Sequence, residues 1–386
     1  MEKMQALIYA IFIDSILTKT MAKPIPSKMN RLPLIIFVIL AFQACTKDDI
    51  SQTPISADAE KVESFLQSKS ANITESPIPL DNSQVTFVEN ISYGNYDENV
   101  FDIFIPQSAT PVPLVIYIHG GGFLGGSRVD CYEPKWGGSW DLPAEINELI
   151  NNDIAFATID YRLLEFSGDS EGVKKSLLDS KRCLQFIRRH SAVLNIDKTN
   201  IVLCGSSAGA GTAQWIAFQD DMADLSNPNP LFWESTRVKG IAVKATQASY
   251  NLKRYETVVF ADYDFSWQDF LAINPNMITR INSFYGMTEI NQFYTNQIKK
   301  YRKRLDMLDM MSSDDPEFWV ANLQPISTIP TDASTLNHHA YHARTMKEYA
   351  DEVGIPNVTY YGNGNGDYAD PSGESFVDFM IRKIEE

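Results

Sequence analysis

The sequence predicts an α/β fold in which a doubly wound, mostly parallel sheet is covered by helices on both faces. Continuous apolar runs at 114–118, 154–159 and 201–204 have the length and composition of fully buried strands. Amphipathic helical patterns at 142–151 and 173–190 separate these runs. Because a parallel strand reaches its neighbour only through a long crossover, this alternation of strands and helices predicts a parallel sheet with two covered faces.

Further strands are expected on either side of this central set. The segments 84–88 and 99–105 predict an opening antiparallel pair, since each is a short apolar or alternating run and turn residues separate them. Later runs at 238–243, 318–323 and 357–361 continue the pattern. With 386 residues and 44% hydrophobic composition, the chain is long enough for one large domain that carries an insertion.

A candidate nucleophile lies where the run at 201–204 ends. Residues 205–209 read Gly-Ser-Ser-Ala-Gly, which fits the pattern G-x-S-x-G between a strand and a helix. Small residues are needed two positions before and after the central serine because strand and helix crowd that corner. Ser207 is therefore the candidate nucleophile, and the amide of Ala208, at the helix start, is a candidate oxyanion donor. Taken alone, the pattern also fits an ordinary tight corner.

A second motif, His119-Gly120-Gly121-Gly122, follows the strand predicted at 114–118. Glycines after a buried strand leave backbone amides uncovered, and we expect Gly120 and Gly121 to donate hydrogen bonds to a developing negative charge. A flexible loop or a phosphate cradle would also be rich in glycine, but the lysine and the spacing of a P-loop are absent. Together, the two motifs supply the nucleophile and the oxyanion hole that acyl transfer needs.

The sequence resembles the α/β-hydrolase superfamily, in particular its carboxylesterases and hormone-sensitive-lipase-like esterases. The resemblance rests on these two motifs, on Asp160-Tyr-Arg-Leu163 and on the run from Asp197 to Gly209. The resemblance covers roughly residues 84–386 and is strongest up to residue 218. It implies a sheet of the α/β-hydrolase type, a serine nucleophile and no cofactor. It also implies that a catalytic acid and then a catalytic histidine follow the nucleophile along the chain.

The regular alternation stops at about residues 250–316. An insertion at this place resembles the helical caps that cover hydrolase active sites, so we expect one domain over 81–386 that carries a cap. Aromatic residues of the cap would either shape an acyl or aryl pocket or pack the core of the cap: Tyr263, Phe265, Trp267, Phe270, Phe284 and Tyr285. The resemblance also places pocket walls just after the glycine run. Five aromatic or apolar residues there would either line the pocket or pack at the surface: Phe123, Leu124, Tyr132, Trp136 and Trp140.

The acid and the histidine that the resemblance implies are not at their usual places. The strand predicted at 318–323 runs into Asn322-Leu-Gln-Pro-Ile326, which contains no carboxylate. No histidine follows the last strand, at 357–361. The general base must therefore come from another part of the chain, if the chain has one.

Three histidines, His338, His339 and His342, stand together at the start of a helix predicted over 336–353. We take one of them as the candidate general base, with Asp332 or Asp367 as the candidate acid that orients it. Spacing does not choose among the three. For each, the alternative is a solvated polar residue in the first turn of the helix.

Residues 1–45 have the features of a targeting signal. The apolar run 32–42 follows a basic residue, is too short to span a bilayer as a helix, and suits the core of a signal peptide. The residues that follow resemble a bacterial lipoprotein signal, in which Cys45 becomes the lipidated first residue. An ordinary cleaved signal is the alternative. Our hypothesis is that translation starts at Met29 or at Met21.

Residues 46–80 are rich in Ser, Asp, Thr and Pro and predict a flexible tether. The acidic stretch directly after Cys45 resembles the tag of bacterial surface lipoproteins. We therefore expect an exported protein that is lipid-anchored in the bacterial envelope, at the outer membrane or cell surface. Contact with the membrane is expected through the lipid anchor only.

The composition restricts the partners. A formal net charge of −16 argues against nucleic acid, because binding of phosphates needs a basic face. No Cys or His spacing suggests a metal site, and the three cysteines other than Cys45 argue against a disulfide framework. The expected ligand is a small-molecule ester.

Two hypotheses follow. The first is a serine carboxylic ester hydrolase that works through a Ser207 acyl-enzyme, with the glycine loop as oxyanion hole and a displaced histidine as base. The second is a degenerate hydrolase that kept the fold but binds a ligand or a partner protein. The intact glycine loop and serine turn favour the first, and the unmatched histidine position favours the second.

Overall fold

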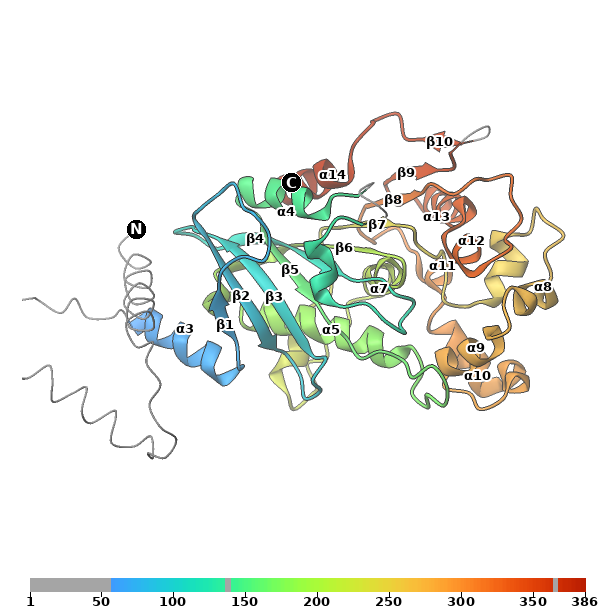
Figure 1. The fold of residues 1–386 in the computed structure, drawn as a ribbon, viewed down its shortest axis with the longest axis horizontal. Coiled ribbons are helices and arrows are strands. Elements are labelled where there is room, and N and C mark those ends of the chain that lie inside the picture. The colour runs from blue at the N-terminus through green and yellow to red at the C-terminus, as the bar shows by residue number, and fades with distance from the viewer. Residues whose placement is uncertain (1–56, 136–139, 364–366) are drawn as a thin grey trace, which may run out of the picture. The chain divides into compact units, whose positions relative to one another are not determined.

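A single ten-stranded sheet forms the centre of the protein in a computed structural model, which describes residues 57–135, 140–363 and 367–386 (Figure 1). The strand order is β1-β2-β3-β5-β4-β6-β7-β8-β9-β10. All neighbours from β5 to β9 are parallel, and the strands outside them pair antiparallel. The predicted α/β class with a mostly parallel sheet is confirmed. The strands are β1 (Asn72–Thr74), β2 (Val85–Ser92), β3 (Val100–Pro106), β4 (Val112–Ile118), β5 (Ala155–Ile159), β6 (Ile196–Ser206), β7 (Gly240–Lys244), β8 (Phe318–Asn322), β9 (Asn357–Tyr361) and β10 (Tyr368–Ala369).

Helices cover both faces of this sheet. On one face, α4 (Leu142–Asn151) and α14 (Phe376–Glu385) share a buried apolar cluster with strand residues such as Val202 and Cys204. On the other face, α5 (Lys174–Arg189) and α7 (Ala208–Ala217) pack against each other and against the sheet. Successive strand residues point to opposite faces, so a strand buried on both sides is apolar throughout, as the sequence showed.

The remaining helices of the described chain are short, apart from α3 and α13. They are α3 (Ala57–Ser68), α6 (Ser191–Leu194), α8 (Trp267–Ala272), α9 (Met277–Tyr285), α10 (Asn296–Lys303), α11 (Met307–Met310), α12 (Ala333–His338) and α13 (Ala340–Val353). Single turns of other helix types lie at Arg128–Tyr132, Pro230–Trp233, Tyr255–Val259 and Ile290–Tyr294. None of the helices in the described ranges is long and apolar enough to cross a membrane.

Residues 250–316 lie between β7 and β8 and form α8 to α11 with two short turns. Figure 1 shows α8, α9 and α10 gathered together, in yellow and orange. Part of this insertion has its own aromatic core, in which Trp267 stacks on Phe270 and Phe293 at 4.9 and 4.5 Å between ring centroids. Part of the insertion therefore packs around its own aromatic rings.

Two boundaries differ from those that the sequence predicts. The helix expected over 336–353 is two helices, because His339 is extended (φ −56°, ψ 144°) and starts α13 as its N-cap. Apolar periodicity continues across this break, so the pattern alone does not reveal it. In addition, the expected tether at 46–80 contains α3 and β1, and β1 gains order by pairing with β2.

Several expectations lie outside the described residues. They concern the signal segment, the starts at Met29 and Met21, the lipid anchor at Cys45, and Trp136.

Candidate active site

Ser207 occupies a sharp corner between β6 and α7, with φ 51° and ψ −119°. The backbone of β4 passes directly against this corner. A Cβ atom on Gly209 would lie 1.9 Å from the carbonyl oxygen of Ile118, and one on Gly205 would lie 2.7 Å from the same oxygen. Both glycines are thus required by close backbone approach, and the turn lifts the Ser207 side chain out of the sheet.

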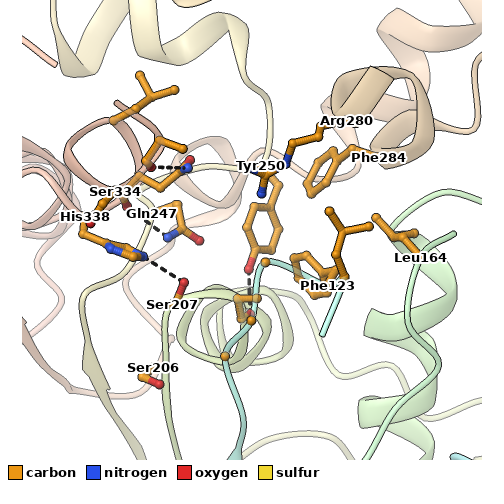
Figure 2. Close-up of a pocket in the computed structure, with 18 of the residues that line it drawn as sticks. Phe123, Leu164, Ser206, Ser207, Gln247, Tyr250, Arg280, Phe284, Ser334 and His338 are labelled. Atoms are coloured by element: carbon orange, nitrogen blue, oxygen red, sulfur yellow. Dashed lines mark hydrogen bonds between the residues drawn. The ribbon is translucent and has the colours of Figure 1, made fainter. Parts of the chain in front are cut away.

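The hydroxyl of Ser207 meets one of the three clustered histidines. Its Oγ lies 2.9 Å from Nε2 of His338, the last residue of α12 (Figure 2). The two residues are 131 positions apart in the sequence. Burial lowers the pKa of His338 below its ordinary value, so that the imidazole is neutral near pH 7 and its Nε2 is able to accept the serine proton.

The backbone on both sides of His338 is tied to the ends of two central strands. Asn322, the last residue of β8, is fully buried, and its Nδ2 donates to the carbonyl of His339 over 3.0 Å. Gln247, just past β7, donates through Nε2 to the carbonyl of Asn337 over 2.9 Å. Because the carboxyl ends of parallel strands share one edge, these anchors hold α12 over the same edge that carries Ser207.

The other two histidines of the cluster serve the backbone. Nδ1 of His339 accepts from the amide of Tyr341, and its Nε2 donates to the carbonyl of Thr328 over 2.9 Å. Nδ1 of His342 accepts from the amide of Ala248, and its Nε2 donates to a carbonyl of α12. Burial lowers the pKa of His342 to about 3. Both rings are saturated by these bonds, so the structure does not bring His339 or His342 to Ser207.

The two candidate acids differ in position. Asp332 is the N-cap of α12 and accepts from the amide of Thr335 over 2.8 Å. Its charge raises the pKa of His338 and opposes the effect of burial, but within the described chain it makes no hydrogen bond to the ring. Asp367 is exposed and lies beside Gly362, where the chain turns from β9 into the edge strand β10. Asp367 does not contribute to the pKa shift of His338, so the structure does not bring Asp367 to the site.

The glycine loop lies directly over the serine. A Cβ on Gly120 would come within 3.2 Å of the Ser207 Cβ, and Gly121 has a positive φ of 103°. Within the described ranges, the amides of Gly120 and Gly121 donate to no protein group. Ala208 is the first residue of α7, where an amide has no partner inside the helix. The amides expected as oxyanion donors thus line one cavity with Ser207.

A buried polar network holds the glycine loop from behind. The ring of His119 stacks on Tyr161 at 4.2 Å, and the Tyr161 hydroxyl donates to the His119 carbonyl over 2.8 Å. Arg128 joins Asp102 and Asp160 at 2.8 and 2.5 Å. Asp160 and Tyr161 belong to the Asp-Tyr-Arg-Leu motif of the sequence, which therefore contributes to the shape of the loop.

Comparison with known families shows what this chain is similar to. A family model described as BD-FAE matches residues 101–340, a range that contains both Ser207 and His338. The chain belongs to the BD-FAE family. The resemblance to esterases of the α/β-hydrolase superfamily is thereby confirmed, as is the α/β-hydrolase type of the sheet.

Curated relatives of this BD-FAE member include esterases. The probable isoprenylcysteine alpha-carbonyl methylesterase ICMEL1 of Arabidopsis thaliana is 28% identical over 164 residues, which cover 42% of this chain and 31% of that protein. Esterase B1 of Culex pipiens is 28% identical over 165 residues, which cover 39% of this chain and 28% of that protein. The chain thus spans less than a third of the length of these relatives.

A solved structure shows the same fold. The structure titled "Truncated form of carbohydrate esterase from gut microbiota" is 14% identical, covers 80% of this chain and 99% of its own, and has a TM-score of 0.54.

The cavity beside Ser207 has a volume of about 480 Å³. Five of the aromatic and apolar residues expected as pocket walls line it: Phe123, Leu124, Trp140, Phe270 and Phe284. The other expected residues that the structure describes do not line it and pack against other aromatic rings: Tyr132, Tyr263, Phe265, Trp267 and Tyr285. In each set, some residues line the cavity and others pack elsewhere, so each of the two interpretations holds for part of the set.

The cavity also contains residues that sequence reasoning missed. Tyr250 donates to the carbonyl of Ala208 over 2.7 Å and joins the cap to α7. Gly211 leaves room for it, since a Cβ there would lie 2.1 Å from the Tyr250 hydroxyl. Gln247 and Arg280 also line the cavity. No motif marks these residues. Across the described ranges, no group of three His, Cys, Asp or Glu side chains is arranged to hold a metal ion.

Proposed function

We propose that this protein is a serine carboxylic ester hydrolase that works through an acyl-enzyme on Ser207. The observation that carries the proposal is the 2.9 Å contact between the Ser207 hydroxyl and Nε2 of a half-buried His338. A nucleophile within hydrogen-bond reach of a neutral base, below unpaired amides, is the arrangement that acyl transfer requires. The esterase-like family of the chain agrees with it.

In the first half-reaction, His338 takes the proton of Ser207 as its oxygen attacks the ester carbonyl. The negative charge that forms on the carbonyl oxygen is stabilised by the amides of Gly120, Gly121 and Ala208. The imidazolium of His338 then gives its proton to the alkoxide, and the alcohol leaves. In the second half-reaction, His338 takes a proton from water as the water oxygen attacks the acyl carbon. His338 then returns this proton to the Ser207 oxygen as the bond between that oxygen and the acyl carbon breaks and the acid leaves.

Asp332 has a weaker part than the acid of a full triad. Its carboxylate is exposed and caps α12, so it stabilises the imidazolium through space and not through a hydrogen bond. Orientation of the ring is left to the anchored backbone on either side of it, through Asn322 and Gln247.

The test is hydrolysis of p-nitrophenyl acetate and butyrate by the wild type, by Ser207→Ala and by Ser206→Ala. Ser206 is a matched control, because it lines the same cavity and contacts Tyr117 but not His338. We expect Ser207→Ala to remove activity and Ser206→Ala to keep it. A fluorophosphonate should label the wild type at Ser207. A wild type that neither hydrolyses these esters nor reacts with the fluorophosphonate would refute the proposal in favour of a degenerate, ligand-binding hydrolase.

A further inference from the structure

One guanidinium group in the cavity has no partner among the residues that the structure describes. Arg280, on the cap helix α9, lines the same cavity as Ser207 and the glycine loop. Its Nη2 would lie 3.2 Å from a Cβ on Gly122, so the side chain reaches the loop. Within the chain that the structure describes, the guanidinium makes no ion pair and donates no hydrogen bond. By contrast, Arg254 of the same insertion is paired with Asp306 at 2.7 Å.

The surroundings of Arg280 make this unusual. Three apolar residues of the same helix line the cavity with it: Met277, Ile281 and Phe284. The one carboxylate in the lining, that of Asp130, accepts from the amide of Ser127 at its own helix turn. Arg280 is half-buried, and its guanidinium offers a planar fork of donors that matches a carboxylate in a bidentate arrangement.

The position of Arg280 indicates which part of an ester it would meet. Figure 2 shows His338 on one side of Tyr250, and Arg280, Phe123 and Phe284 on the other. Because His338 protonates the departing alcohol, the alcohol lies on the His338 side, and the acyl group extends away from it. Arg280 therefore faces the acyl portion.

We propose that the acyl group of the substrate carries a carboxylate that Arg280 binds, so that the protein hydrolyses monoesters of dicarboxylic acids. This inference rests on the proposed function. The reaction breaks the bond between the acyl carbon and the alcohol oxygen. Water supplies a hydroxyl to the acyl carbon and a proton to the alcohol, so a dicarboxylic acid and an alcohol are released. The chain has a net charge of −16, which repels anions, and a local cation offsets this at the site.

The experiment compares two substrate series by proton release at constant pH. One series is the monomethyl esters of dicarboxylic acids from butanedioic to octanedioic acid, and the other is the methyl esters of the matching monocarboxylic acids. The variants are Arg280→Met, which keeps the apolar stem, and Arg280→Lys, which keeps the charge. Arg304→Met removes an exposed charge from the same insertion outside the cavity and serves as the matched control.

For Arg280→Met, we expect kcat/KM on the best monoester of a dicarboxylic acid to fall about 10- to 100-fold, mainly through KM. The value for the neutral ester should stay within about twofold. Arg280→Lys should recover part of the loss, Arg304→Met should cause none, and salt should weaken the preference. An unchanged ratio between the two series in Arg280→Met would overturn the inference and leave the esterase proposal standing.

Binding separates the two proposals. Isothermal titration of monomethyl hexanedioate into Ser207→Ala measures recognition without turnover. We expect binding that becomes about tenfold or more weaker when Arg280→Met is added. If Ser207→Ala binds the monoester no better than methyl hexanoate, the inference is wrong whether or not the wild type is an esterase. If binding depends on Arg280 but no ester is hydrolysed, recognition of the carboxylate stands and the hydrolase proposal fails.

Discussion

Replacement of His338 by alanine tests the geometry of the site most directly. The ring is in direct contact with the Ser207 hydroxyl, and no other histidine of the described chain is placed to substitute for it. Loss of a positioned general base costs about 10²- to 10⁴-fold in rate. For a base that also protonates the leaving group, we expect the upper end of this range in kcat, or about 4 to 5.5 kcal/mol of transition-state stabilisation.

Asp332→Asn provides the comparison within the same helix. Its carboxylate is exposed and acts on His338 only through space, and such interactions contribute at most about 1 kcal/mol, which is about fivefold in rate. We therefore expect the loss in Asp332→Asn to be smaller than that in His338→Ala by at least about a hundredfold.

The assay is kcat and KM on p-nitrophenyl butyrate at pH 8, with the thermal midpoint of each variant recorded. His339→Asn is the folding control, since asparagine is able to cap α13 as His339 does. Equal losses in Asp332→Asn and His338→Ala would show that the acid has a full triad role, against our reasoning. Activity of His338→Ala within tenfold of the wild type would show that His338 is not the base.

Four further outcomes are expected. Burial lowers the pKa of His338, so the acid limb of kcat/KM should lie below 6.5; Asp332→Asn should move it lower still, because that charge raises the pKa of His338. Gly209→Ala should destabilise the fold by about 1 to 3 kcal/mol or prevent folding, as measured by urea unfolding, since its Cβ would overlap the Ile118 carbonyl. The pKa of His342 is about 3 when folded and ordinary when unfolded, so its contribution to stability is full above pH 6.5 and is lost as the pH falls toward 3. His342→Gln should accordingly flatten the decline in unfolding free energy by up to about 1.4 kcal/mol per pH unit between pH 6 and 4. Cys45→Ser should move the protein from the membrane fraction to the soluble fraction of a bacterial host, and retention in membranes would contradict a lipid anchor at that residue.

Local patterns carried most of what could be predicted. The strand, turn and helix around Ser207 occupy one continuous stretch. Gly205 and Gly209, on either side of the serine, are required by the close approach of backbone at this corner. The glycine run after β4 is likewise a local signal. The alternation of buried runs with amphipathic helices predicted the class of the fold, because a strand that is buried on both faces is a continuous apolar run in the sequence.

The choice among three histidines could not be made in this way. His338, His339 and His342 fall within five positions, and their different environments depend on a break in the helix at His339 and on anchors from β7 and β8. Asn322 illustrates the point. In the sequence it marks a missing carboxylate, whereas in the structure its amide fixes the backbone beside the candidate base.

By itself, the sequence determined the fold class, the nucleophile candidate and the glycine loop, because each depends on neighbours along the chain. The tertiary structure alone decided which histidine reaches Ser207 and which acid does not contact that histidine. It also decided that Arg280 of the cap faces the cavity without a partner among the described residues. Contacts of this second kind join residues that are dozens to more than a hundred positions apart. They depend on how loops leave the ends of parallel strands, and local periodicity holds no information about that.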